Sequence, residues 1–232
     1  MKKYEHLFFD LDHTLWDFDT NARHALHEVY NTLRLKDAGV LDVELFYTLY
    51  LQHNEGLWEQ YRNGKIKQDE LRVKRMRLTL LDFKIINEAL ATEMNELFLD
   101  LLPIRNTLFP HTMELLTYLQ NRKYHIHMIT NGFNSVQQKK ITNSGLAPFF
   151  KHVITSEMSM SLKPNREIFE YAFKQTGAEA YNSIMIGDTE EVDIAGAKQV
   201  GMDQIFVNHI SDTYTSKATY TVTHLQEIEN IL

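Results

Sequence analysis

Cysteine is absent from this chain of 232 residues. Its absence excludes disulfide bonds, thiolate metal sites and a cysteine nucleophile. Proline and glycine are also scarce. The chain has 4 prolines and 9 glycines among its 232 residues, about half of the roughly 12% that the two residue types together make up on average. A chain with so few turn-forming residues is expected to be ordered and rich in helices and strands. Its length suits one large domain or a core domain with an insertion.

Long apolar runs are missing as well, since none approaches the roughly 18 residues that a membrane-spanning helix requires. In the first stretch, MKKYEHLFFDLDHTLW, the acidic residues Glu5, Asp10 and Asp12 interrupt the apolar segment that a signal peptide needs. The chain has 24 basic and 31 acidic residues, a balance that argues against a nucleic-acid-coating protein. We therefore expect a soluble, cytoplasmic protein that binds neither membranes nor nucleic acid.

Five short apolar segments that end in small polar or acidic residues are expected to form buried parallel strands. They cover residues 6–12, 125–131, 152–156, 183–188 and 204–208. Stretches with helical spacing cover residues 111–122, 134–143, 166–176 and 191–200. This alternation predicts an α/β fold, with a parallel sheet that carries helices on both faces.

The segment from residue 17 to about 100 breaks the alternation. Its apolar residues recur at intervals of three and four, as in Leu26, Val29 and Leu33, and only the turn at Asn63-Gly64 interrupts it strongly. We expect a helical cap of roughly four helices over residues 17–102, inserted into a core formed by residues 1–16 and 103–232. The cap would begin just after the acidic end of the first strand.

Asp10 and Asp12 stand at that acidic end. They are two residues apart, so the strand period would direct both side chains toward one side. In open α/β sheets, ligands bind outside the carboxyl ends of the strands. Two carboxylates that converge there oppose each other's ionisation unless a cation lies between them. Taken alone, the pair also suits an ordinary turn with two acids.

A second acidic cluster ends the fourth expected strand, where Gly187 and Asp188 are followed by Asp193. Glycine admits a close backbone approach, and carboxylates are the hard oxygen ligands that magnesium prefers. The alternative is an acidic helix N-terminus, where such residues interact favourably with the helix dipole.

Two further motifs follow the second and third expected strands. Thr130, Asn131 and Gly132 offer a hydroxyl, an amide and a glycine, which suit a phosphate-binding turn and also a plain turn. Lys163 precedes Pro164, which favours an extended backbone and would hold the ammonium group at a fixed place. A lone lysine is more commonly a solvated surface charge.

The four motifs, in this order, resemble those of the haloacid dehalogenase (HAD) superfamily of aspartate-nucleophile phosphohydrolases, with an α-helical cap inserted after the first motif. The resemblance covers essentially the whole chain. It implies a Rossmann-like, five-stranded parallel sheet of order 5-4-1-2-3, in which the first and fourth strands are neighbours. A finer resemblance, to the pyrimidine 5'-nucleotidase branch (YjjG/YfnB-like), lies in the stretches FFDLDHTLWDFD, ITNGFNSVQQKKITNSGL, KPNREIFEYAF and MIGDTEEVDIAGAKQVG.

By this resemblance, Asp10 is the nucleophile and Asp12 the general acid and base. The residues that would bind substrate are Thr130, Asn131 and Lys163. The implied ligands of Mg²⁺ are Asp10, the backbone carbonyl of Asp12, and Asp188. The residues in supporting positions are Gly132 and Asp193. This sequence departs from the family pattern at His13, which replaces the glycine that is common after the second aspartate.

The predicted function is therefore a magnesium-dependent hydrolase of phosphate monoesters that acts through an aspartyl-phosphate, with a nucleoside (pyrimidine) 5'-monophosphate as its small-molecule substrate. One alternative is a phosphatase or mutase of another small phosphate ester, such as a sugar phosphate. Outside enzymes, the alternative is a phospho-accepting regulatory module, but such modules are usually shorter and lack a helical cap. A dehalogenase is disfavoured, because it has no use for metal-binding acids at Asp188 and Asp193.

His125 and His127 lie on one face of the second expected strand. Paired histidines suggest zinc, but no third ligand is evident in the sequence. We therefore expect these two residues to serve in packing.

Overall fold

The structure is a computed structural model that describes residues 4–209 and 216–232. The chain divides into two compact units, of which one comprises Met1–Phe18 with Asn106–Leu232, and the other Asp19–Arg105. The assignment of a catalytic core and a cap to particular residue boundaries stays a prediction.

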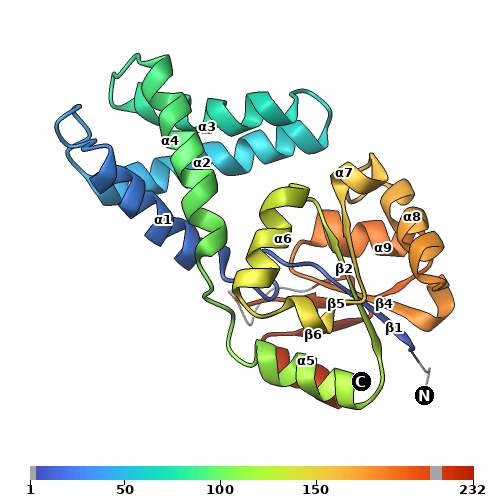
Figure 1. The fold of residues 1–232 in the computed structure, drawn as a ribbon. Coiled ribbons are helices and arrows are strands. Elements are labelled where there is room, and N and C mark those ends of the chain that lie inside the picture. Colours follow the sequence, from blue (N-terminus) through green and yellow to red (C-terminus); the bar gives the residue numbers. More distant parts are fainter. Residues whose placement is uncertain (1–3, 210–215) are drawn as a thin grey trace. The chain divides into compact units, whose positions relative to one another are not determined.

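A parallel sheet of six strands, in the order β3-β2-β1-β4-β5-β6, forms the centre of the first unit (Figure 1). The strands are β1 (His6–Phe9), β2 (His125–Thr130), β3 (His152–Thr155), β4 (Ser183–Gly187), β5 (Asp203–Val207) and β6 (Tyr220–Val222). The predicted α/β fold and the order of its first five strands are confirmed. The predicted number of strands was wrong, because β6 has only 3 residues, two of them exposed, and so no apolar run marks it.

Helices cover both faces of this sheet. They are α5 (Thr112–Asn121), α6 (Asn134–Asn143), α7 (Ser156–Ser159), α8 (Arg166–Thr176) and α9 (Ala195–Gln199). Phe169 of α8 and Ala197 of α9 pack in one buried cluster with Phe8, Ile129 and Met185 of the strands. The connection from β1 to β2 through α5 and the connection from β4 to β5 through α9 run in opposite directions across the sheet. Because crossovers between parallel strands are right-handed, α5 lies on the face opposite to α8 and α9.

The chain reverses its direction of travel across the sheet at β1, which lies between β2 and β4. Phe9 at the end of β1 pairs with Ile186 of β4, and the main-chain N–H of Asp10 donates to the carbonyl oxygen of Ile186 at 2.9 Å. The carboxyl ends of these two strands are therefore neighbours. Such a switch point is where ligands bind in open α/β sheets.

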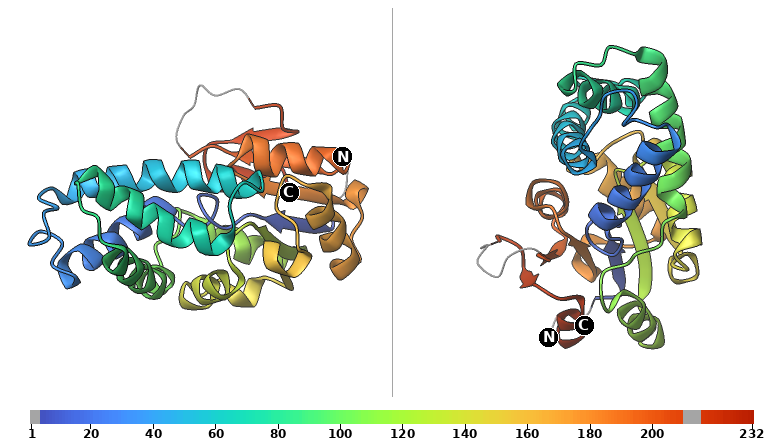
Figure 2. Two further views of the ribbon diagram at one scale, coloured as in Figure 1. Left: turned by 90° about the horizontal axis from the view of Figure 1, so that it is seen from above. Right: turned by 90° about the vertical axis from the view of Figure 1, so that its left-hand side faces the viewer.

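The second unit is helical, as predicted for the inserted cap. Its helices are α1 (Phe18–Thr32, whose first residue belongs to the first unit), α2 (Val43–Arg62), α3 (Gln68–Asp82) and α4 (Glu88–Leu101). Helix α3 packs against both α2 and α4 (Figure 2). The side chain of Asp42 accepts from the first-turn N–H groups of Glu44 and Leu45, and Asn87 caps α4 in the same way. Within the described parts of the chain, no helix has the length and apolar character needed to cross a bilayer.

Histidines meet on one face of the sheet near the amino ends of its strands. Nδ1 of His6 lies 3.1 Å from Nε2 of His127. The ring of His125 lies 5.0 Å from that of His6, and the ring of His152 lies 5.3 Å from that of His127. Burial, reinforced by the neighbouring imidazoles, lowers the pKa of His127 to about 3. The ring of His127 stacks on those of His6 and Phe8, which favours packing for this residue.

We expect His127 to make the protein less stable in acid. In the unfolded chain its imidazole takes up a proton near pH 6.5, but in the folded chain only near pH 3. Between these values the unfolded state binds more protons, so the free energy of unfolding falls as the pH falls. The melting temperature (Tm) of wild type should drop more than that of His127→Gln between about pH 7.5 and about pH 5. The exposed His24 supplies the control, because His24→Gln should keep the wild-type dependence; equal drops in wild type and His127→Gln would contradict this expectation.

Candidate active site

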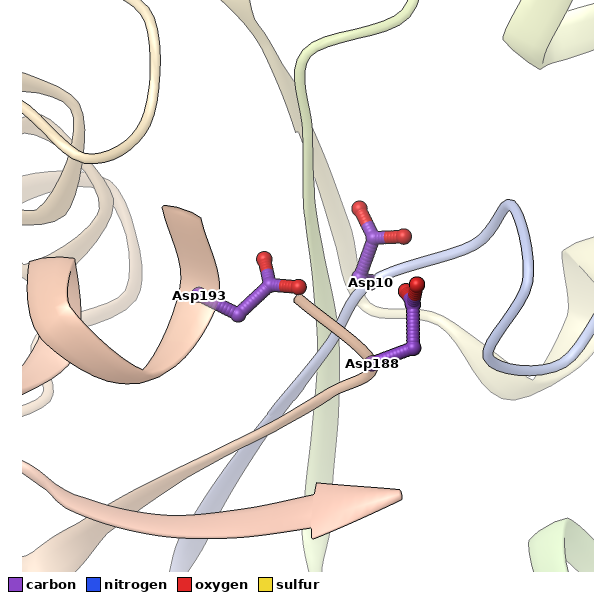
Figure 3. A group of neighbouring side chains, drawn as sticks. All are labelled: Asp10, Asp188 and Asp193. Carbon is purple, nitrogen blue, oxygen red and sulfur yellow. The ribbon is translucent and has the colours of Figure 1, made fainter. Parts of the chain in front are cut away.

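Three carboxylates from two neighbouring strand ends come together in the first unit. Asp10 follows β1, Asp188 follows β4, and Asp193 lies in a short π-helical turn, η4 (Glu190–Ile194). One oxygen from each of the three side chains lies within 4.8 Å of the others (Figure 3). Side chains 178 positions apart in the sequence, at 10 and 188, therefore meet at one end of the sheet.

Lys163 lies between two of these acids. Its Nζ donates to Asp10 Oδ1 at 2.5 Å, to Asp193 Oδ1 at 2.6 Å and to the carbonyl oxygen of Ile129 at 2.7 Å. The side chain is only 1% exposed. Burial by itself lowers the pKa of Lys163, but the negative charges of Asp10 and Asp193 raise it by a larger amount. The net shift is therefore upward, and the ammonium stays charged.

Asn131 places the main chain of Lys163. Its Oδ1 accepts from the N–H of Lys163 at 2.7 Å, and its Nδ2 donates to the carbonyl oxygen of Lys163 at 2.9 Å. These two bonds tie the end of β2 to the segment before α8. The structure thus gives Asn131, which the sequence placed among the substrate-binding residues, a contact that orients the lysine.

Asp193 and Asp188 are each held by further polar groups. Asp193 Oδ2 accepts from the N–H of Thr189 at 3.1 Å. Asp188 accepts from the hydroxyl of Thr14 at 3.0 Å on Oδ1 and from that of Thr189 at 3.1 Å on Oδ2. Gly187 permits this approach, because a Cβ there would lie 2.5 Å from Cγ of Asp193. Thr14 was missed by the sequence analysis, although it stands only two residues after Asp12.

The site carries an excess of negative charge. Three carboxylates face one ammonium, which leaves two negative charges if every acid is ionised. Burial, followed by repulsion from Asp193 and Asp188, raises the pKa of Asp10 well above its usual range, even though Lys163 opposes the shift. Burial and repulsion from Asp193 raise the pKa of Asp188 to about 7. A divalent cation would balance the two charges, and carboxylate oxygens are ligands suited to Mg²⁺, so the donor set fits the predicted metal.

Thr130, at the end of β2, presents a hydroxyl whose proton has a clear direction. Its Oγ1 accepts from the N–H of Gly132 at 3.1 Å and from Nε2 of Gln137 at 2.8 Å. Two accepted bonds fill the oxygen lone pairs, so the O–H itself is left to donate to another acceptor. A phosphate oxygen is such an acceptor. A Cβ at residue 132 would lie 2.4 Å from the side chain of Gln137, which explains the glycine.

Asp12 lies in the turn that follows β1, which ends at Phe9. Side chains of helix α6 hold its carboxylate. Its Oδ1 accepts from Nζ of Lys140 at 2.6 Å and its Oδ2 from Nε2 of Gln137 at 3.0 Å. The strand period used in the sequence analysis therefore does not set the direction of this side chain. Gln137 and Lys140 were missed there, although their spacing of three, which puts both on one face of a helix, is a usable signal.

His13 has φ 62°, in the left-handed region that favours glycine. This conformation explains why a glycine is common at the position, and it costs a residue with a Cβ about 1 kcal/mol. The N–H of His13 donates to the carbonyl oxygen of Trp16 at 2.9 Å, which closes the turn. The departure from the family pattern therefore leaves the turn intact.

Comparison with known proteins decides the family. The family described as haloacid dehalogenase-like hydrolase matches residues 4–201. The chain belongs to this family. The predictions of a HAD-superfamily member and of an enzyme, a hydrolase, are confirmed.

Individual HAD relatives extend over nearly the whole chain. Pyrimidine 5'-nucleotidase PynA of Streptococcus pneumoniae is 31% identical over 99% of this chain and 95% of its own length. Glyceraldehyde 3-phosphate phosphatase of Methanocaldococcus jannaschii is 31% identical over 97% of this chain and 96% of its own. A crystal structure of the HAD-hydrolase YfnB from Bacillus subtilis, bound to magnesium, has a TM-score of 0.89 and 28% identity, and the match covers 100% of this chain and 99% of that one.

The excess charge predicts how magnesium changes stability. In the unfolded chain Asp188 loses its proton near pH 3.8, but in the metal-free folded chain only near pH 7, so the metal-free fold loses stability as the pH rises through this range. Bound magnesium would remove that penalty, and below about pH 7 it would first have to displace a proton. The gain in Tm on adding magnesium chloride should therefore be larger at about pH 8 than at about pH 5.5.

Two variants sharpen this measurement. Asp188→Asn should lose most of the gain in Tm, because it removes one of the converging carboxylates. Asp69→Asn alters a carboxylate that is 97% exposed in the other unit and should keep the wild-type gain. A Tm that does not respond to magnesium at either pH would count against a metal site here.

Proposed function

We propose that this enzyme is a magnesium-dependent phosphatase that hydrolyses nucleoside 5'-monophosphates, those of pyrimidines foremost, through a phosphoryl group carried on Asp10. The observation that carries the proposal is the meeting of Asp10, Asp188 and Lys163 at the adjoining ends of β1 and β4. We also propose a cytoplasmic location, which a chain without cysteine suits, because that compartment is reducing.

The first half of the proposed reaction transfers the phosphoryl group to the enzyme. A phosphate monoester is a dianion and repels a carboxylate nucleophile, so positive charge must face it first. Lys163 supplies one such charge, and the hydroxyl of Thr130 donates a hydrogen bond to a phosphate oxygen. Magnesium, when bound by the carboxylates of Asp10 and Asp188 and the backbone carbonyl of Asp12, supplies further positive charge at the phosphate. A carboxylate oxygen of Asp10 bonds to phosphorus while the bond from phosphorus to the ester oxygen breaks, and Asp12 gives that leaving oxygen a proton.

The second half returns the enzyme to its starting state. Asp12, now ionised, takes a proton from a water molecule, and the water oxygen bonds to phosphorus. The bond between phosphorus and Asp10 breaks, which releases inorganic phosphate and restores the carboxylate. One residue thus serves as acid and then as base, so its carboxyl group must be held within reach of both oxygen atoms.

A second candidate function is hydrolysis of a small sugar phosphate. It is favoured by the relative named glyceraldehyde 3-phosphate phosphatase, which matches this chain at the same 31% identity as the nucleotidase PynA. The same reacting residues serve both substrate classes, since they act on the phosphoryl group that both share.

We expect Asp10→Asn to lower phosphate release from p-nitrophenyl phosphate by about 10³-fold or more, because the amide is a poor nucleophile. EDTA should abolish wild-type release, and added magnesium should restore it. Asp69→Asn, in an exposed helix position, should keep wild-type activity. Full activity in Asp10→Asn would remove this residue from the mechanism, and release that stops at one phosphate per chain would instead indicate a phospho-accepting module.

A substrate panel separates the two candidate functions. We expect kcat/KM to be higher for uridine and cytidine 5'-monophosphates than for purine nucleotides or glyceraldehyde 3-phosphate. The same magnesium-containing buffer and released-phosphate assay serve for every ester. A preference for the triose phosphate would favour the second candidate and leave the proposed chemistry at Asp10 unchanged.

A further inference from the structure

We propose that Lys140 and Gln137, two buried side chains of α6, are positioning residues that fix the carboxylate of Asp12 for proton transfer. This inference rests on the proposed phosphatase function, and it assigns a role to two side chains outside the four motifs. Neither residue touches Asp10, Asp188 or Lys163 through any hydrogen bond found in the described ranges, so their effect on the reaction passes through Asp12 and its surroundings.

Each oxygen of Asp12 is bound by a different one of these residues. Lys140 Nζ lies 2.6 Å from Oδ1, and Gln137 Nε2 lies 3.0 Å from Oδ2. The last torsion of an aspartate side chain is broad and weakly restrained on its own. Because the two donors come from one helix and bind opposite oxygens, they define both the place and the plane of the carboxylate.

The ammonium of Lys140 contacts Asp12 and is shielded from solvent. Its side chain is 3% exposed, and its Nζ lies 4.3 Å from the ring centre of Trp16 and 5.5 Å from that of Phe18. Both rings belong to the segment that follows Asp12, and their faces attract a cation. A buried ammonium is costly without a counter-charge, and Asp12 provides it. The ion pair therefore joins α6 to the catalytic turn.

Gln137 connects Asp12 to the phosphate-binding end of β2. Its Nε2 donates to Thr130 Oγ1 at 2.8 Å as well as to Asp12. The side chain is fully buried, and in the described structure its Oε1 has no hydrogen-bond partner. Exchanging the amide oxygen and nitrogen would aim an acceptor at the carboxylate of Asp12, so the observed orientation is the one that satisfies Asp12. A buried unpaired amide oxygen costs stability, and the two hydrogen bonds that Nε2 donates offset that cost. One of the two bonds fixes the carboxylate of Asp12, as proton transfer requires.

The proton transfers show why position matters. In the first half-reaction a proton moves from Asp12 to the leaving oxygen as the ester bond breaks, and in the second a proton moves from water to Asp12 as the water oxygen bonds to phosphorus. A displacement of about 1 Å in such a group can cost about 10²-fold in rate. Lys140 and Gln137 hold Asp12 in one place through both steps.

The test compares two pairs of like residues on α6. Lys140→Met and Gln137→Leu remove the donors to Asp12, whereas Lys139→Met and Gln138→Leu make the same changes at exposed neighbours. Each variant is assayed with magnesium on p-nitrophenyl phosphate, whose leaving group departs without a proton, and on uridine 5'-monophosphate, whose alkoxide needs one. Glyceraldehyde 3-phosphate replaces the nucleotide if wild type prefers it.

We expect Lys140→Met and Gln137→Leu to lower kcat/KM for the alkyl phosphate by about 10²-fold. For p-nitrophenyl phosphate we expect a loss of only about tenfold, because the departure of the leaving group depends on Asp12 as an acid only in the alkyl ester. KM should change little in Lys140→Met, since Lys140 is buried and its hydrogen bond goes to Asp12 and not to Thr130. Lys140→Arg should retain more activity on the alkyl ester than Lys140→Met, because it keeps a cationic donor. The two control variants should match wild type on both esters.

Other outcomes overturn the inference. Equal losses on the two esters, accompanied by a lower Tm, would show that the pair serves only to stabilise the fold. Wild-type rates in both Lys140→Met and Gln137→Leu would show that Asp12 needs neither partner. Should Lys140→Met fail to fold, the ester comparison with Gln137→Leu and Lys140→Arg decides the matter. A wild-type protein that hydrolyses none of the esters would overturn the proposed function itself, which is a separate result.

Discussion

The buried ammonium of Lys163 is the interaction on which the site depends. All three of its N–H groups are used, on Asp10, Asp193 and the carbonyl oxygen of Ile129. A buried ion pair repays its lost hydration only when every donor is satisfied in this way. Because its partners come from β1, from β2 and from the turn after β4, the lysine draws three segments that are distant in the sequence into one place.

The same cluster is under electrostatic strain, since its acids outnumber its cation. Asp10 and Asp188 have raised pKa values because they are buried beside other carboxylates. That imbalance is unfavourable in the metal-free fold, and it would favour the divalent cation proposed above. The hydroxyls of Thr14 and Thr189 and the main chain of Thr189 orient Asp188 and Asp193 within the cluster.

Helix α6 contributes to the site in a different way, through buried polar side chains on a face that otherwise packs. Gln137 and Lys140 are buried, whereas Gln138 and Lys139, of the same residue types, are exposed. Residue type therefore does not indicate which glutamine and which lysine face Asp12. The spacing of three between Gln137 and Lys140, which puts both on one face of the helix, is the signal that distinguishes this pair. The turn after Asp12, with its left-handed His13, brings the aspartate to this face.

Five strands, the helical insertion and the family could be predicted from the sequence, because apolar runs, helical periodicity and ordered motifs are local properties of the chain. The sequence did not reveal β6, whose pairing with β5 is specified by backbone hydrogen bonds and not by an apolar pattern. Nor did it show that Asn131 holds the main chain of Lys163, or that α6 and not strand alternation directs Asp12. Those contacts follow from the packing of the helices and strands, because they join residues that are far apart in the sequence. The hydrogen bond from Lys163 to Asn131 spans 32 positions, and that from Lys140 to Asp12 spans 128.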